Sequence, residues 1–156
     1  MKPYRKNVGI VVFNKEGKVL VGERLNFIGS WQFPQGGVDE GEDLLEAAKR
    51  ELYEEVGIQD ATLVYEIPEW INYDFPPNLK MKIADKYRGQ SQKWFLFYWN
   101  KEVTECNLKI HEQEFGRVQF LELEKTFDTI VEFKKDVYKI LIEKFSPIIK
   151  KFIEGI

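Results

Sequence analysis

The stretch RELYEEVG, residues 50 to 57, gathers acidic side chains at a spacing that suits one face of a helix. At about 100° per residue, Glu51, Glu54 and Glu55 fall within one arc of a helix surface. The adjacent arc is apolar and would face a core, with Leu45, Ala48, Leu52 and Val56. A solvated helix face is the simplest explanation of such a pattern. The alternative explanation is a functional site built from clustered carboxylates.

Arg50 stands beside these acids and can pair with Glu54 or with Glu46, each four residues away. One guanidinium does not neutralise four nearby glutamates, so negative charge remains on this face. Carboxylate oxygens suit hard divalent cations, and no histidine or cysteine lies in the stretch to favour zinc. The pattern therefore predicts a site for Mg²⁺ or Mn²⁺.

Short β-prone runs surround the helix that would carry this site. Strong helix formers fill residues 44–56, the loop PQGGVDEGED precedes them, and Gly57 ends them. A turn at NKEG joins the first two predicted strands. Strands are predicted at 8–13, 18–24, 31–33, 61–67, 92–99 and 117–123.

The C-terminal segment predicts a second long helix, because apolar residues recur at helical spacing from Phe133 to Phe145. Pro147 is expected to break or restart this helix, since proline lacks the N–H that a helix interior needs. Residues 68–91 are expected to form a long loop. Helices that do not alternate regularly with strands indicate an α+β fold, and residues 1–156 are expected to form a single domain.

The composition excludes several classes of function. The 156 residues carry 23 basic and 26 acidic side chains, a formal charge of -3, so no global positive field exists and stable DNA binding is not expected. The single cysteine, Cys106, excludes an internal disulfide. The apolar run near the N-terminus is too short for a signal peptide or a membrane span. A cytoplasmic location is expected.

Residues 36 to 58, GGVDEGEDLLEAAKRELYEEVGI, resemble the Nudix box. The box specifies a glycine, a glutamate six residues on, and then an arginine and three glutamates around an apolar residue, before a final glycine and apolar residue. All of these positions are filled, by Gly36, Glu42, Arg50, Glu51, Leu52, Glu54, Glu55, Gly57 and Ile58.

The resemblance implies a Nudix hydrolase, an α/β/α sandwich with a mixed sheet that acts on a nucleoside diphosphate linked to another moiety. By the family pattern, Mg²⁺ or Mn²⁺ is held by Glu51, Glu54, Glu55 and the backbone carbonyl of Gly36. Arg50 orients the glutamates, Glu42 supports the loop, and the glutamate that acts as base varies within the family. Such ions offset the charge of the polyphosphate and lower the pKa of a bound water.

The resemblance extends over nearly the whole chain. YRKNVGIVVFN, SWQFPQGG, WINYDFPP, GQSQKWFLF, EFG and VEFKKDVYK are similar to the group that joins bacterial RNA pyrophosphohydrolases with plant-type asymmetrical diadenosine tetraphosphate hydrolases. DEGED and YDFPP favour the plant-type branch. Glu114 matches the distal acid that completes the metal site, although Val118 and Phe120 stand where the group commonly has tryptophans.

Further positions match residues that lie near phosphate or nucleotide in this group: Arg5, Ser30, Gln32, Tyr73 and Lys134, with Arg24 and Phe133 flanking a base. A guanidinium and a phenyl ring make a sequence-tolerant clamp for a base, and a lysine supplies a point charge for phosphate. The alternative for Phe133 is a core position on the last helix.

Two more features have open interpretations. The segment 78–91 concentrates Lys80, Lys82, Lys86 and Arg88 against one acid, Asp85, and forms either a local positive field or a solvated loop. His111 has no serine or cysteine partner in a motif, so it is expected on a surface loop without a role.

Two classes of function fit these features: a metal-dependent pyrophosphohydrolase, and a Nudix module that binds nucleotide or RNA without turnover. The intact set of carboxylates favours the enzyme. The expected reaction is asymmetrical cleavage of diadenosine tetraphosphate to ATP and AMP. The alternative is conversion of 5′-triphosphate RNA ends to 5′-monophosphate ends. Both substrates present a base, a ribose and a chain of three or more phosphates.

Overall fold

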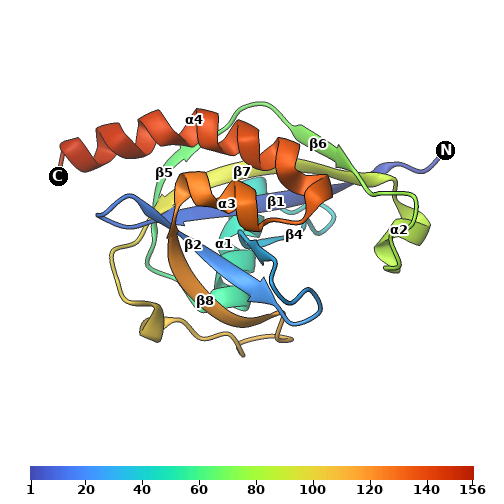
Figure 1. Cartoon of the computed structure of the whole chain (residues 1–156), viewed down its shortest axis with the longest axis horizontal. Helices are drawn as coiled ribbons and strands as arrows, with labels where there is room; N and C mark the ends of the chain where they lie inside the picture. Colours follow the sequence, from blue (N-terminus) through green and yellow to red (C-terminus); the bar gives the residue numbers. More distant parts are fainter.

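The computed structural model describes residues 1–156 and has a mixed sheet between two layers of helix (Figure 1). The strands are β1 (Tyr4–Phe13), β2 (Lys18–Arg24), β3 (Trp31–Gln32), β4 (Gln35–Gly37), β5 (Thr62–Glu66), β6 (Ile71–Asp74), β7 (Gly89–Tyr98) and β8 (Phe115–Glu122). The helices are α1 (Leu44–Val56), α2 (Ile83–Lys86), α3 (Thr126–Thr129) and α4 (Lys135–Glu154), and short 3-10 turns lie at Val103–Glu105, Leu123–Lys125 and Glu132–Lys134.

Five of the eight strands follow the order β3-β2-β1-β7-β5. Of the other three, β4 pairs with β1, β6 with β7 and β8 with β2. The β1–β7 pair is parallel and runs in register from Tyr4 with Gly89 to Phe13 with Tyr98. All other pairs are antiparallel. The mixed sheet and α+β class expected from the sequence are therefore confirmed.

Both faces of the central strand β1 are buried, because its side chains alternate between two cores. Val8, Ile10 and Val12 pack with α1, including Leu52 and Val56. Val11 and Phe13 point the other way, into a core that α4 covers with residues such as Leu141, Phe145 and Ile149. This alternation places α1 and α4 on opposite faces of the sheet, as Figure 1 shows.

Helix α1 has the bounds that the sequence predicts, and both of its ends are capped. The Asp43 side chain accepts a hydrogen bond from the backbone N–H of Glu46 over 3.2 Å. Gly57 ends the helix in the left-handed conformation, with φ 74°, which costs a glycine little. These caps fix where the glutamate-bearing face begins and ends.

Two expectations about the second half of the chain are wrong. Residues 68–91 are not one long loop, because β6 pairs with the start of β7 and α2 lies between these two strands in the sequence. Ile71 and Tyr73 are buried while Asn72 and Asp74 are exposed, the alternation of a strand that covers a core on one face. Pro147 does not break α4, which runs through it to Glu154. The buried face of α4 continues beyond the proline to Ile149. The packing of this face holds the helix in place.

No helix combines the length and the apolar character needed to cross a membrane.

Candidate active site

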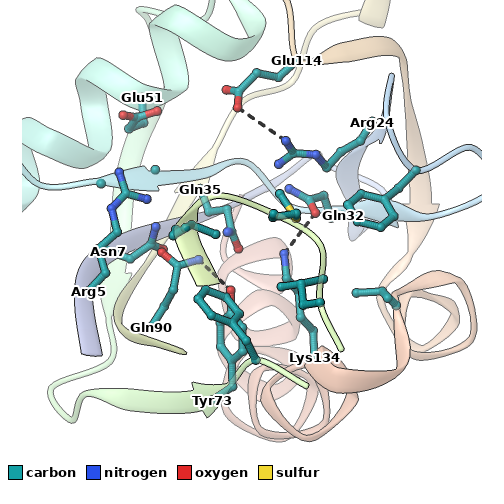
Figure 2. Close-up of a pocket in the computed structure, with 18 of the residues that line it drawn as sticks. Arg5, Asn7, Arg24, Gln32, Gln35, Glu51, Tyr73, Gln90, Glu114 and Lys134 are labelled. Carbon is teal, nitrogen blue, oxygen red and sulfur yellow. Dashed lines mark hydrogen bonds and ion pairs between the residues drawn. The ribbon is translucent and has the colours of Figure 1, made fainter. Parts of the chain in front are cut away.

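A cavity of about 440 Å³ opens between α1, the β1–β4 edge and the turn before α4. Glu51 and Glu114 lie at one end with Arg5 and Arg24 beside them, and Tyr73 and Lys134 lie at the other end (Figure 2). The lining includes Gly36, Glu51, Glu54 and Glu114 from the predicted metal set. It also includes all seven of the predicted substrate-binding residues: Arg5, Arg24, Ser30, Gln32, Tyr73, Phe133 and Lys134. The fold thus brings together residues that are far apart in the sequence.

Strand β4 lies directly against the glutamate face of α1. A Cβ atom added to Gly36 would lie 2.0 Å from Cδ of Glu51, so only a glycine leaves room for that carboxylate. One residue earlier, the backbone N–H of Gln35 donates to Oε2 of Glu55 over 2.9 Å. The close approach of β4 therefore sets the position of two of the glutamates.

Arg50 is the hub of the acidic cluster. Its Nε and Nη2 atoms donate to the two oxygens of Glu42 at 2.9 and 3.0 Å, and Nη2 also reaches the carbonyl of Gly37 at 3.0 Å. Its Nη1 atom donates to Glu51 at 2.9 Å and to Glu54 at 3.5 Å. Arg50 therefore ties the loop before α1 to two glutamates, in keeping with the orienting role that the family pattern implies.

Of the two pairings that the sequence left open, Arg50 takes Glu54. The other candidate, Glu46, lies 3.9 Å from Lys49 instead. The hydrogen bonds from Arg50 hold the pKa of Glu42 below its usual value. A carboxylate that stays charged beside Arg50 keeps the loop fixed to the helix.

The pKa values of the buried glutamates shift in the opposite direction, upward. Burial raises the pKa of Glu51 to about 7, although Arg50 opposes the shift. Burial, together with the nearby charges of Glu114 and Glu51, raises the pKa of Glu55 well above its usual value. Glu55 is 4% exposed, and its Oε1 atom has no hydrogen-bond partner. Arg50 and Arg24 offset only part of the negative charge at this end of the cavity.

The donor set fits a divalent cation. Glu55 has an unpartnered buried oxygen, Glu51 lies against the Gly36 backbone, and every donor in the set is oxygen. In this structure no three acidic, histidine or cysteine side chains are gathered closely enough to enclose an ion, and Glu51 and Glu54 accept hydrogen bonds from Arg50.

Two cationic side chains line the side of the cavity that faces away from α1. Arg24 lies 3.8 Å from Glu114, and its Nε atom donates to the side chain of Asn26 over 3.0 Å. Lys134 donates to Oε1 of Gln32 over 3.2 Å, and burial lowers the pKa of its ammonium group to about 7. Arg24 and Lys134 thus supply positive charge on the side opposite α1 (Figure 2).

An aromatic group forms the wall beside Lys134. The Phe133 ring lies 5.9 Å from the Tyr73 ring and 6.4 Å from the Phe75 ring, centre to centre. Phe133 belongs to the 3-10 turn before α4, not to the long helix, and it both packs against the core and lines the cavity. The two interpretations of Phe133 are therefore compatible.

Other lining residues were not predicted from the sequence, among them Asn7, Gln35, Phe75, Met81, Gln90 and His111. Asn7 could have been found, because it lies two residues after Arg5 on a strand and so faces the same side. His111 is exposed on a loop, as expected, but its Nδ1 atom lies 4.0 Å from Oε1 of Glu54, at the mouth of the cavity. No local signal in the sequence indicates that proximity.

The NUDIX domain model matches residues 3–141, and the chain belongs to this family. The glutamate helix, its arginine and the mixed α/β/α sandwich are the features of a Nudix hydrolase, and the protein is an enzyme of that class. Nudix hydrolases generally need divalent metal ions, in keeping with the oxygen donors described above.

Relatives with stated names cover nearly the whole chain. An RNA pyrophosphohydrolase of Bartonella clarridgeiae is 44% identical over 156 residues, covering 92% of this chain and 90% of the relative. Nudix hydrolase 26, chloroplastic, of Arabidopsis thaliana is 41% identical over 150 residues, covering 92% of this chain and 69% of the relative. Among solved structures, a C. elegans Ap4A hydrolase binary complex is similar with a TM-score of 0.66 and 22% identity, over 97% of this chain and 99% of that one.

Proposed function

We propose that this protein is an RNA pyrophosphohydrolase that uses Mg²⁺ or Mn²⁺ to convert 5′-triphosphate RNA ends to 5′-monophosphate ends. The observation that carries the proposal is 44% identity, over 92% of the chain, to a protein named RNA pyrophosphohydrolase. The likeness to Ap4A hydrolases is one of fold, at 22% identity. The proposal therefore places triphosphate RNA before diadenosine tetraphosphate as substrate, whereas the sequence favoured the dinucleotide.

The two ends of the cavity suit the two parts of a triphosphate RNA end. Glu51, Glu54, Glu55, Glu114 and the carbonyl of Gly36 are the residues that would hold the metal. When bound, such ions offset phosphate charge and lower the pKa of a water molecule. The chain itself supplies Arg50, which orients the glutamates through hydrogen bonds to Glu51 and Glu54. One of these carboxylates would take the proton of the attacking water.

The cationic and aromatic side chains of the cavity suit the phosphates and the first base. Lys134 and Arg5 offer positive charge to phosphate oxygens, and Arg5 forms no ion pair with any carboxylate of the protein. Its guanidinium lies on the backbone of Gly37, where an added Cβ would be 2.1 Å from Nη2. Arg24 and Phe133 provide a cation and a ring for a base, and Ser30 and Gln32 provide polar contacts.

The segment 78–91 contributes less positive charge than its sequence indicates. Arg88 is paired with Asp74 at 2.8 Å and covers the ring of Tyr4 at 4.6 Å. Lys82 lines the cavity, and Lys80 and Lys86 lie in the same segment between β6 and β7. These three lysines would meet the phosphates of the following nucleotides, and that contribution should weaken with salt.

The proposal is tested by measuring kcat/KM side by side on a short triphosphate RNA and on diadenosine tetraphosphate, with Mg²⁺ and with Mn²⁺. The expected result is a higher kcat/KM on RNA, with pyrophosphate or two successive phosphates released. The RNA reaction should also slow more with added salt, because more phosphates are bound. A higher kcat/KM on the dinucleotide, with ATP and AMP as products, would instead support the dinucleotide hydrolase.

A further inference from the structure

The connection between β2 and β3, residues 25–30, carries part of the cavity lining. Arg24, the last residue of β2, lines the cavity, and so do Phe27 and Ser30 of this 25–30 loop. Arg24 is one of the two residues expected to flank a base, and its side chain lies in the cavity (Figure 2). The position of the loop therefore affects how a base would be held.

Two hydrogen bonds tie the 25–30 loop to its surroundings. At the start of the loop, the backbone N–H of Leu25 donates to the carbonyl of Glu114 over 2.9 Å. Near its far end, the backbone N–H of Gly29 donates to Oε2 of Glu23 over 2.8 Å. The other backbone hydrogen bonds of the loop close turns within it or with the end of β2. The Glu23 carboxylate therefore holds the far half of the loop.

Glu23 is a buried carboxylate that does not line the cavity, and its side chain is 9% exposed. The strand register places it between Trp31 of β3 and Arg117 of β8, so the three side chains form a row on one face of the sheet. Nε of Arg117 donates to Oε1 of Glu23 over 2.9 Å, and the guanidinium lies 4.9 Å from the centre of the Trp31 ring. Each oxygen of Glu23 thus has its own partner, Arg117 for one and the loop for the other.

The sheet is irregular directly after Glu23. The pairing of β2 with β8 shifts register between Glu23 and Arg24, and irregularities of this kind redirect the side chain that follows. Arg24 lines the cavity, where its Nη2 atom lies 3.8 Å from Glu114 and its Nε atom donates to Asn26 of the loop. Arg24 and the loop are thus connected, so an anchor for the loop also bears on Arg24.

We propose that Glu23 is a positioning residue for base recognition: its carboxylate holds the 25–30 loop, and with it Arg24, where they bind a base of the substrate. The hydrogen bonds from Arg117 and Gly29 hold the pKa of Glu23 below its usual value. The carboxylate therefore stays charged at neutral pH and accepts a stronger hydrogen bond than a neutral group would. The inference rests on the proposed function, because it needs a substrate that carries a base.

The loop anchor and the ion pair can be separated by replacing each charged partner with methionine. Glu23→Met keeps a side chain of similar length but removes the acceptor for the Gly29 N–H. Arg117→Met removes the same ion pair and leaves that acceptor in place. Glu122→Met, the same chemical change on an exposed side chain of β8, is the control. Glu23→Ala serves if Glu23→Met does not fold.

Two probes that share a chain of phosphates separate base recognition from phosphate binding. One is a 5′-triphosphate dinucleotide RNA with methylene groups between its phosphates, which resists cleavage, and the other is inorganic tripolyphosphate. Kd for each is measured by calorimetry with Mg²⁺ present. Glu23→Met should weaken binding of the dinucleotide at least about fivefold, the lower end of what stacking of one base contributes. Its Kd for tripolyphosphate should not change.

Arg117→Met should leave both Kd values nearly unchanged, because the Arg117 side chain is 68% exposed and such ion pairs contribute little. Glu122→Met should leave both unchanged. Deuterium uptake of residues 25–30, measured by mass spectrometry, should rise in Glu23→Met and not in Arg117→Met, since only the first leaves the Gly29 N–H without its partner. In the Glu23→Met background, Arg24→Ala should weaken dinucleotide binding less than it does alone.

Equal losses of dinucleotide binding in Glu23→Met and Arg117→Met would overturn the inference, because they would assign Glu23 to the ion pair and not to the loop. An unchanged Kd for the dinucleotide in Glu23→Met, or an equal loss for tripolyphosphate, would overturn it as well. None of these outcomes depends on hydrolysis. A protein that cleaves no RNA but shows the selective loss would contradict the proposed function and support this inference.

Discussion

Gly36 and Glu51 are in direct contact: a Cβ added to the glycine would lie 2.0 Å from Cδ of the glutamate and 2.1 Å from its Oε2. The contact joins β4 to α1 at the acidic end of the cavity. It explains in steric terms why a glycine opens the Nudix box of this chain, since any side chain there would displace the carboxylate.

Gly36→Ala should therefore lower kcat at least about a hundredfold, because a displaced Glu51 no longer supplies its charge where it is needed. Gly155→Ala is the control, since the nearest atom to its added Cβ is 3.5 Å away. Steady-state kinetics and a thermal melt measure both variants. A fully active Gly36→Ala enzyme would show that Glu51 does not need its present position.

Replacing Glu54 or Glu55 by Gln keeps the size of the side chain but removes its charge. We expect each change to lower kcat at least about a hundredfold with little loss of stability, because catalysis at such a site is largely electrostatic. Glu46→Gln is the matched control on the same helix, on an exposed side chain. Unfolding of either variant, with the control folded, would mean that the cluster is structural.

Phe133→Ala should raise KM for RNA at least about fivefold and leave kcat nearly unchanged, because the ring would stack on a base. Phe127 is the comparison: it lies on α3, close in sequence but outside the cavity lining. Phe127→Ala should leave KM as it is. A lower melting temperature with an unchanged KM for Phe133→Ala would assign that ring to the core alone.

Lys134 should make phosphate binding depend on pH. Burial lowers its pKa to about 7, so the free enzyme carries the ammonium charge below that pH and loses it as the pH rises. KM for RNA should therefore rise between pH 7 and 9. In Lys134→Met, KM should be high throughout and the rise should be absent. Equal slopes for the two proteins would mean that the pH dependence comes from another group.

Local patterns were enough to predict α1 and most strands, because helix formers, Gly57 and alternating apolar residues are local signals. Strands β4, within the expected loop PQGGVDEGED, and β6 were missed because each is short and is held by pairing with another strand, which the sequence does not display. The same limit applies to the cavity. Gln92 bonds to Asn7 across 85 positions of sequence, and only the parallel pairing of β1 with β7 makes them neighbours. The Nudix box marked the acidic residues of the cavity, whereas the contact of Gln92 with Asn7 needed the folded chain.

The most direct test of the central claim is mass spectrometry of a short 5′-triphosphate RNA after incubation with the protein and Mg²⁺ or Mn²⁺, with diadenosine tetraphosphate in the same tube and a chelator arm as control. We predict that the RNA loses two phosphates and ends as a 5′-monophosphate, and that the chelator abolishes the change. An RNA that keeps its triphosphate while the dinucleotide is split to ATP and AMP would contradict the proposed function.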